Sequence, residues 1–401
     1  MGEVVGAVIC EGLGTVRPLE GWREPPAGEG QVEYLYAYRP DLFPRPSALT
    51  DMWRYLDLLP IGDREVRYPL RVGATPLIAP PELRRTLGLP RLHLKDETWG
   101  PTGSNKDRAT ALVLEHALRT GASTVTCAST GNVATSLAVG AAAAGLRAVV
   151  FVPEDVDPAK LRLMLLAGAD VLRVREGYEA AFRLSREAAR AFGWLDRNTG
   201  VNPMTVEAKK TVAFEIFEQL GRAVPDVVLA PVGDGPTLAA LAKGFRELAE
   251  CGVADRMPRV VGVQAEGCQP VRRAFREGRP VAVVEPRTLA DGIAVGAPVS
   301  APAVLRAVRE SGGGLVAVAD DELLSAIRAL AAGAGVLAEP AGAAAFAGLW
   351  PARAEELLSP DETVVALVTG SGLKTPQFLE PARAAHTVSA DLDQVARAVG
   401  P

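Results

Sequence analysis

The sequence predicts an α/β protein built on mostly parallel sheets with helices on both faces. Short valine-rich apolar runs alternate with helical patterns from about residue 120 to residue 368. Apolar residues make up 48% of the chain and charged residues 23%, a balance that excludes wholesale disorder. The length of 401 residues exceeds what one ordinary core supports, so we expect two units or one large α/β unit.

The alternation begins with a βαβ unit. Residues 124–127 form a β-type run, residues 133–145 have a helical pattern, and residues 147–152 form a second strand that Pro153 ends. Further helices are predicted over 161–168, 178–192, 206–220, 238–250 and 321–332, and further strands over 170–174, 227–232, 260–263 and 364–368. Repeated strand–helix units favour a parallel sheet. The proline-rich first sixty residues predict an extension packed over the main body.

Composition excludes several classes of function. The formal charge of −5 and the lack of a basic patch argue against nucleic-acid binding. Four scattered cysteines without a CxxC pair and only three histidines argue against a metal site or a disulfide framework. The longest apolar stretch, residues 133–153, is interrupted by Thr135, Ser136 and Arg147, so we expect no membrane span and a cytoplasmic protein.

The first segment that could carry chemistry surrounds Lys106. Lysine is scarce here, with seven lysines among 43 basic residues. A Pro-Thr-Gly-Ser turn with the hydroxyls of Thr102 and Ser104 leads into a helix and places Lys106 in its first turn. The helix dipole there disfavours the charged amine, which favours Schiff-base chemistry. A capped helix start with a surface lysine is the alternative.

Three further loops come directly after predicted strands. The loop with Ser129, Thr130 and Asn132 offers hydroxyls, an amide and helix-start N–H groups suited to a carboxylate. The glycine loop consists of Gly233, Asp234, Gly235, Pro236 and Thr237, and it suits a phosphate if the Asp234 carboxylate turns away. Thr369 ends the last strand, where its hydroxyl could meet a ring nitrogen. Each segment alone is equally compatible with a plain turn.

Taken in order, these segments resemble the threonine synthase branch of the fold type II, tryptophan synthase β-like, pyridoxal-phosphate (PLP) enzymes. The similar segments are residues 73–77, 95–97, 101–108, 129–132, 202–203, 210–216, 243–245, 290–296, 339–341 and 369–374. The resemblance implies two mostly parallel sheets flanked by helices. It also implies a large PLP-binding domain from residues 61–115 and 201–401, an inserted small α/β domain from residues 116–200, and an N-terminal extension over residues 1–60.

The resemblance also implies roles. Lys106 would hold PLP covalently and then shuttle protons, the 233–237 loop would cradle the cofactor phosphate, and Asn132 and Thr369 would meet the pyridine ring. The expected substrate site comprises Thr102, Ser104, Ser129, Thr130 and Asn132. The implied reaction converts O-phospho-L-homoserine and water to L-threonine and phosphate, in a homodimer that takes a phosphorylated amino acid.

Some positions depart from the family pattern. Asn105 replaces a usual Phe, Gly-Asp-Gly-Pro-Thr replaces a common Gly-Asn-Ala-Gly-Asn, and Glu-Ala-Lys-Lys-Thr at 207–211 replaces Glu-Gly-Gln-Lys-Thr. A threonine or serine dehydratase, a phosphate-replacing relative such as cysteate synthase, and a catalytically inactive amino-acid sensor therefore stay open as alternatives. The candidates for a substrate-phosphate subsite are Lys160, Arg162, Lys209 and Lys210.

Overall fold

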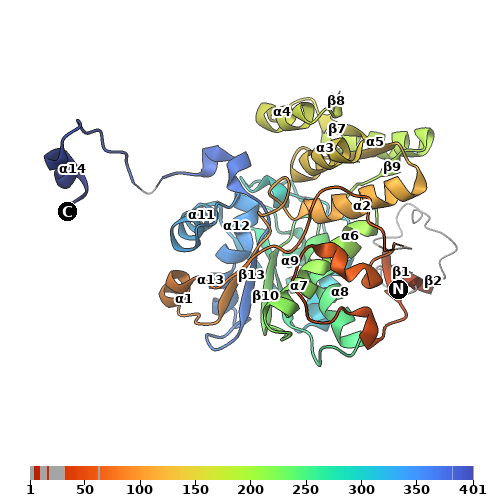
Figure 1. Cartoon of the computed structure of the whole chain (residues 1–401), viewed down its shortest axis with the longest axis horizontal. Helices are drawn as coiled ribbons and strands as arrows, with labels where there is room; N and C mark the ends of the chain where they lie inside the picture. The colour runs from red at the N-terminus through yellow and green to blue at the C-terminus, as the bar shows by residue number, and fades with distance from the viewer. Residues whose placement is uncertain (1–3, 10–15, 18–31, 62–63, 382, 401) are drawn as a thin grey trace.

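A six-stranded sheet forms the centre of the computed structural model, which describes residues 4–9, 16–17, 32–61, 64–381 and 383–400 (Figure 1). Its strand order is β12 (Gly314–Val318), β11 (Arg259–Ala265), β10 (Val227–Pro231), β13 (Val364–Val368), β5 (Leu92–Asp96) and β4 (Leu77–Ile78). All neighbours are parallel except the β4–β5 pair. The sequence did not reveal β4, β5 or β12 as strands.

Helices cover both faces of this sheet because successive strand residues point to opposite sides. On β10, Val227 and Leu229 pack with α1 (Pro81–Leu87), α11 (Asp320–Ala334), α12 (Pro340–Ala347) and α13 (Leu349–Ala354). Val228 and Ala230 pack with α7 (Thr211–Gln219), α8 (Pro236–Glu250), α9 (Pro270–Glu277) and α10 (Ala301–Glu310). Burial on both faces explains the continuous apolar runs of these strands.

A second sheet has four parallel strands in the order β8 (Asp170–Val174), β7 (Arg147–Pro153), β6 (Thr124–Ala128) and β9 (Leu195–Asp196). α2 (Lys106–Thr120) and α3 (Asn132–Ala144) cover one face, together with Met164 of α4 (Pro158–Leu166). α5 (Tyr178–Phe192) covers the other face. These strands lie within residues 116–200, while the division of the chain into domains stays a prediction.

The helix predicted over 206–220 is wrong as one element, because two helices occupy this range. α6 (Met204–Lys209) ends and α7 begins at Thr211. The Thr211 hydroxyl donates to the carbonyl of Ala208 at 2.6 Å, and the N–H of Ala213 reaches back only three residues, to the carbonyl of Lys210. This tightened turn interrupts the regular i to i−4 pattern.

The N-terminal residues contain regular structure that the prediction of an irregular extension missed. β2 (Val16–Arg17), β1 (Val4–Ile9) and β3 (Val32–Tyr36) form an antiparallel sheet. The N–H of Tyr34 and the hydroxyl of Tyr36 donate to the buried Glu207 carboxylate, at 3.3 and 2.8 Å, so β3 is fastened to α6. Cys10 lies outside the described residues; Cys127, Cys251 and Cys268 are free thiols.

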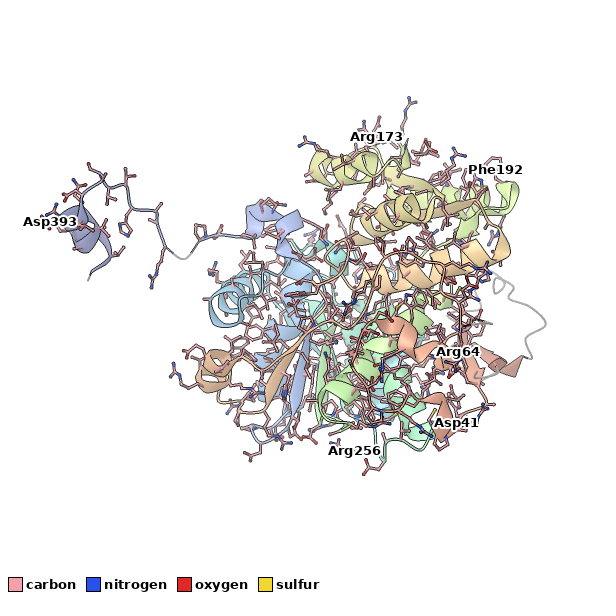
Figure 2. The ribbon with its side chains drawn as sticks, viewed as in Figure 1. Asp41, Arg64, Arg173, Phe192, Arg256 and Asp393 are labelled. Carbon is pink, nitrogen blue, oxygen red and sulfur yellow. The ribbon has the colours of Figure 1, made fainter. Side chains whose placement is uncertain are left out.

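Short 3-10 helices and a C-terminal helix complete the chain. The 3-10 segments are η1 (Pro40–Leu42), η2 (Met52–Leu58), η3 (Asp291–Ile293), η4 (Gly372–Lys374) and η5 (Pro376–Phe378). α14 (Leu392–Val399) has no buried residue and stands apart from the body, with Asp393 far from Phe192 at the end of α5 (Figure 2). Within the described residues, no helix is long and apolar enough to cross a membrane, and no cluster of three metal-ligating side chains occurs.

Candidate active site

The four segments singled out in the sequence each come after a strand. The Lys106 turn follows β5, the glycine loop follows β10 and Thr369 follows β13, all at the carboxyl edge of the large sheet. The loop with Ser129 follows β6 of the small sheet. Parallel strands place their carboxyl ends at one edge, which is where open α/β sheets bind ligands.

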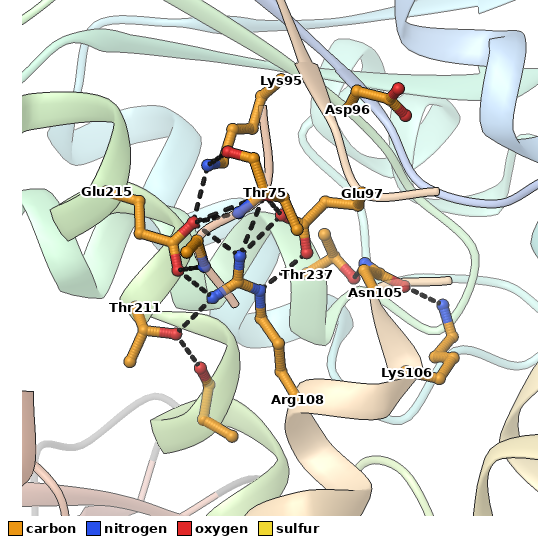
Figure 3. Close-up of polar contacts among 12 residues, drawn as sticks. Thr75, Lys95, Asp96, Glu97, Asn105, Lys106, Arg108, Thr211, Glu215 and Thr237 are labelled. Atoms are coloured by element: carbon orange, nitrogen blue, oxygen red, sulfur yellow. Dashed lines mark hydrogen bonds and ion pairs between the residues drawn. The ribbon is translucent and has the colours of Figure 1, made fainter. Parts of the chain in front are cut away.

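Lys106 is the first residue of α2, and its amine connects to the glycine loop through Asn105. Lys106 Nζ donates to Asn105 Oδ1 at 2.8 Å, and Asn105 Nδ2 donates to Thr237 Oγ1 at 3.2 Å (Figure 3). Burial lowers the pKa of Lys106 to about 8, because the low-dielectric surroundings disfavour the ammonium; Glu339 opposes the shift. The amine is thus partly neutral near neutral pH.

The Lys106 turn is bound to the last segment by backbone contacts. The N–H of Asn105 donates to the carbonyl of Thr369 at 3.0 Å, and the N–H of Ser371 donates to the carbonyl of Gly103 at 2.8 Å. Lys374 Nζ adds hydrogen bonds to the carbonyls of Thr102 and Gly103 at 3.0 and 3.1 Å. The buried Thr369 therefore lies directly beside the residue that precedes Lys106.

Glu339 joins the second segment to the fourth. Asn132 Nδ2 donates to Glu339 Oε1 at 2.6 Å, and the N–H of Glu339 donates to the carbonyl of Gly370 at 3.0 Å. Ser129 Oγ accepts from the N–H of Gly131 at 3.2 Å, and α3 begins at Asn132 without a side-chain cap. Thr130 is half-buried in the same turn. The helix start therefore keeps donors for an anion such as a carboxylate.

The glycine loop has the form of a phosphate cradle. Gly235 has φ +105° at the start of α8, where no side chain caps the helix and Pro236 takes the first position. A Cβ on Gly233 would lie 2.9 Å from the carbonyl oxygen of Gly292, so only glycine fits. Buried polar atoms without a hydrogen-bond partner include Ser104 Oγ, Asp234 Oδ2 and Ser300 Oγ. The two orphaned hydroxyls, Ser104 Oγ and Ser300 Oγ, and the bare helix start fit the phosphate and polar groups of PLP.

Two residues of the predicted site have other contacts. The Thr102 hydroxyl donates to Asp107 Oδ1 at 2.5 Å, and its N–H donates to Asp107 Oδ2 at 2.9 Å. Thr102 thereby orders the turn before Lys106. The Asp234 carboxylate turns back, since its Oδ1 accepts from the N–H of Val299 at 2.7 Å.

A buried ionic cluster, comprising Lys95, Glu97, Arg108 and Glu215, supports the Lys106 turn (Figure 3). Arg108 contacts Glu97 Oε1 and Oε2, each at 2.7 Å, and Glu215 Oε1 and Oε2 at 2.6 and 2.8 Å. Lys95 Nζ lies 2.6 Å from Glu215 Oε2. The nearby cations keep the pKa of Glu215 well below its usual value despite burial. The cluster links β5, α2 and α7 two residues beyond Lys106.

The candidate cations for a substrate-phosphate subsite fall into separate environments. Lys210 is paired with Glu207 and Glu247, and Lys160 with Asp291. Arg162 is on the outer helix α4. Lys209 is buried near Lys106.

Sequence reasoning missed two residues of this site. Arg197 Nη2 donates to the carbonyl of Lys106 at 3.3 Å, and Glu339 contacts Asn132. Glu339 could have been recognised from the sequence, because it precedes Pro340 at the start of a helix. Arg197 could not, because an arginine after a short strand is usually a surface residue.

The comparisons with known proteins agree with this geometry. Residues 68–370 match the family model "Pyridoxal-phosphate dependent enzyme". Threonine synthase of Methanosarcina acetivorans is 36% identical over 92% of this chain and 93% of its own length. Threonine synthase of Methanocaldococcus jannaschii is 38% identical over 81% of both chains. The crystal structure of the T.th. threonine deaminase superposes with a TM-score of 0.63 at 28% identity, covering 74% of this chain and 92% of that one.

These matches confirm the fold type II α/β architecture and the resemblance to threonine synthases that the sequence predicts. The expected cofactor, PLP, is confirmed with them. The sequence, the sheets and the strand-end loops agree on one assignment: the chain belongs to the family of pyridoxal-phosphate dependent enzymes.

Proposed function

We propose that this chain is a PLP-dependent lyase that converts O-phospho-L-homoserine and water to L-threonine and phosphate. The observation that carries the proposal is the Lys106 amine, which lies where the strand-end loops meet and is linked through Asn105 to the glycine loop. Relatives named threonine synthase, 36–38% identical over most of the chain, support the choice of reaction.

The residues present could hold PLP in one arrangement. Lys106 Nζ would bind the cofactor covalently, the 233–237 loop and the start of α8 would bind its phosphate, and Thr369 and Asn132 would contact its ring. When bound, PLP supplies an electron sink that stabilises the negative charge left after a proton is removed from the substrate. A neutral hydroxyl such as that of Thr369 beside the ring nitrogen, in place of a carboxylate, would leave that nitrogen less strongly protonated.

Lys106 is also suited to move a proton. A general base is most effective when its pKa is near the working pH, and burial brings the pKa of Lys106 to about 8. Asn105 Oδ1 fixes the position of Nζ before any ligand binds. We infer that this amine takes the proton from the substrate's α-carbon and later returns a proton to the product.

The substrate carboxylate is expected at the start of α3. Ser129, Thr130 and the N–H groups of the first turn of α3 supply donors there, and the helix dipole favours an anion. Ser104 Oγ, buried and without a partner, is a further donor that a substrate could satisfy. Thr102 acts only through the turn, because Asp107 occupies its hydroxyl.

A substrate panel tests the reaction. The purified holoenzyme is incubated with O-phospho-L-homoserine and O-phosphoserine while phosphate release is measured, and with threonine and serine while ammonia release is measured. We expect phosphate and threonine from phosphohomoserine and loss of this activity in Lys106→Ala. Ammonia release alone would favour a threonine or serine dehydratase, and phosphate release only from phosphoserine would favour a cysteate synthase-like reaction. A chain that binds amino acids without turnover would be a sensor.

We further propose that the substrate is a phosphorylated amino acid and that the protein is a homodimer that works in the cytoplasm. Residues 61–115 and 201–401 form the large domain and residues 116–200 the small one, with the site between them. Light scattering coupled to gel filtration tests the dimer, and limited proteolysis tests the domain boundaries.

A further inference from the structure

Arg197 is a fully buried arginine that lies against the first turn of α2. It directly follows β9, and none of its surface is exposed. Its Nε donates to Thr110 Oγ1 at 3.1 Å, and its Nη2 donates to the carbonyl of Lys106 at 3.3 Å. Because residues 106 and 110 are one turn apart on α2, the guanidinium lies along this turn, beside the residue expected to hold PLP.

The charge of Arg197 is not compensated by a carboxylate. Its third contact is with Thr199, whose hydroxyl accepts from Nη1 at 3.1 Å. The three partners are thus two hydroxyls and a carbonyl, and no ion pair joins Arg197 to another described residue. Arg108, which is equally buried, instead contacts two glutamates. Burying a cation among neutral groups costs free energy, which favours a functional role for the charge.

The turn that carries Arg197 is fixed to the small sheet. The N–H of Arg197 donates to the carbonyl of Thr126 in β6 at 2.8 Å. The next residue, Asn198, is also buried; its Oδ1 accepts from the N–H of Ala128 at 2.8 Å, and its Nδ2 donates to Ser185 Oγ at 3.0 Å. These contacts with β6 and α5 set the position of the guanidinium before any ligand binds.

Arg197 differs from the other cations near Lys106 because it keeps its charge. Burial lowers the pKa of Lys209 well below its usual value and also lowers the pKa of Lys374, so both amines lose their protons more readily. Burial lowers the pKa of Arg197 only to about 10, so the guanidinium stays protonated at neutral pH. Arg197 is therefore a permanent positive charge at this end of α2.

The surroundings of Lys106 contain charges of both signs. Burial lowers the pKa of Lys106; Glu339 opposes this shift and Arg197 adds to it. The start of α2 acts in the same direction as Arg197, because it is the positive end of the helix dipole. The other titratable groups that face Lys106 or Arg197 are Asp107, Cys127, Asp196, Lys209 and Lys374.

We propose that Arg197 is a positioning residue that keeps the Lys106 amine neutral. Its fixed positive charge, held against the first turn of α2, disfavours a second positive charge on Lys106. The neutral amine is the form that binds PLP and that accepts a proton, because both steps use the lone pair of the nitrogen. This role rests on the proposed function, in which Lys106 performs both steps.

The pH dependence of PLP rebinding tests the role of the charge. A C=N bond forms between Lys106 Nζ and the aldehyde carbon of PLP, and the aldehyde oxygen leaves as water, so the rate follows the fraction of neutral amine. Apoenzyme is mixed with PLP at a series of pH values, and the visible absorbance of the covalent complex is followed. Free PLP titrates identically in every sample, so a difference between variants reports the protein.

Removing the charge should move the pH midpoint of this rate. Arg197→Gln should raise the midpoint by about one pH unit, because the ammonium form of Lys106 is no longer opposed by the guanidinium. Rebinding at pH 7 should then be about tenfold slower than in the native apoenzyme, whereas the rates should converge well above the midpoint. Melting curves establish that the variant is folded.

Two substitutions of Thr199 separate charge from packing. Thr199→Asp and Thr199→Asn introduce side chains of the same size, but only the aspartate can form an ion pair with Arg197 and cancel its charge. Thr199→Asp should therefore raise the midpoint, and Thr199→Asn should leave it unchanged. Both variants keep Arg197, so the comparison is also available if Arg197→Gln does not fold.

The outcomes distinguish this role from the proposed reaction. A midpoint of Arg197→Gln within about 0.3 pH units of the native value would refute the role, even if rebinding were slower at every pH. If Arg197→Gln does not fold, an unchanged midpoint in Thr199→Asp would refute it instead. If the midpoint moves but phosphohomoserine releases no phosphate, the role of Arg197 stands and the proposed reaction fails. If phosphate is released and the midpoint does not move, the reaction stands and the role fails.

Discussion

Removing the Glu215 carboxylate should destabilise the protein strongly. Glu215 accepts from Lys95 and twice from Arg108, and all three side chains are fully buried. With Glu97 the cluster holds two cations and two anions, so its net charge is zero. Glu215→Gln leaves it at +1. Breaking a buried pair from one side costs about 3–5 kcal/mol.

The expected shift in melting temperature follows from the chain length. An unfolding entropy of roughly 2.1 cal/mol/K per residue gives about 0.8 kcal/mol/K for this chain of 401 residues. The loss then corresponds to a decrease of about 4–6 °C, measured by differential scanning calorimetry. The pKa of Glu215 is below its usual value in the folded protein. The difference in melting temperature between the native protein and Glu215→Gln should therefore persist at pH 6–8 and narrow as the pH falls below about 4.3.

Two further variants make the test specific. Glu82→Gln, which removes an exposed pairing with Arg85, should leave the melting temperature unchanged. Lys95→Met combined with Glu215→Gln restores a neutral cluster. The double variant should therefore lose less free energy of unfolding than the two single variants lose together, by about 1 kcal/mol or more. A melting temperature of Glu215→Gln within about 1 °C of the native value would refute the electrostatic reasoning.

Three other predictions concern the site. The apoenzyme should rebind PLP faster as the pH rises through about 8, because only the neutral Lys106 amine attacks; a rate independent of pH would contradict this, and Lys106→Ala should bind no PLP covalently. Gly235→Ala should lower the free energy of unfolding by about 2 kcal/mol, because φ is +105° and the added Cβ would lie 2.5 Å from Val304 Cγ2. An unchanged melting curve would contradict this expectation. Asn105→Ala should weaken PLP binding about tenfold in fluorescence titrations of the apoenzyme, whereas undiminished affinity would show that the link to Thr237 is dispensable.

Local patterns predicted a fully buried strand and an amphipathic helix correctly. The predicted strand 364–368 coincides with β13, and the predicted helix 178–192 coincides with α5. β5 was not predicted, because His93 and Lys95 alternate with its leucines and this pattern is not typical of a buried strand. Lys95 can be buried there only because Glu215, 120 residues away, supplies its counter-charge. Periodicity in a short window cannot contain that partner.

The same limit applies to the site. The residue types of the four loops could be read from the sequence, since each follows a strand. The contacts that join them could not, because Asn132 and Glu339 are 207 residues apart and Asn105 and Thr237 are 132 apart. Thr102 was assigned to the substrate by its type, but its hydroxyl is taken by Asp107 five residues later. Such competition between partners is settled only by packing.

The strand order of the large sheet has a consequence for synthesis on the ribosome. β13 lies between β10 and β5, so strands at residues 92–96 and 227–231 wait for residues 364–368 before the sheet can close. The small sheet draws all its strands from residues 124–196 and can form much earlier. Translation therefore produces a folded small unit flanked by unpaired strand edges, and the nascent chain depends on protection from aggregation until nearly all of it has been made.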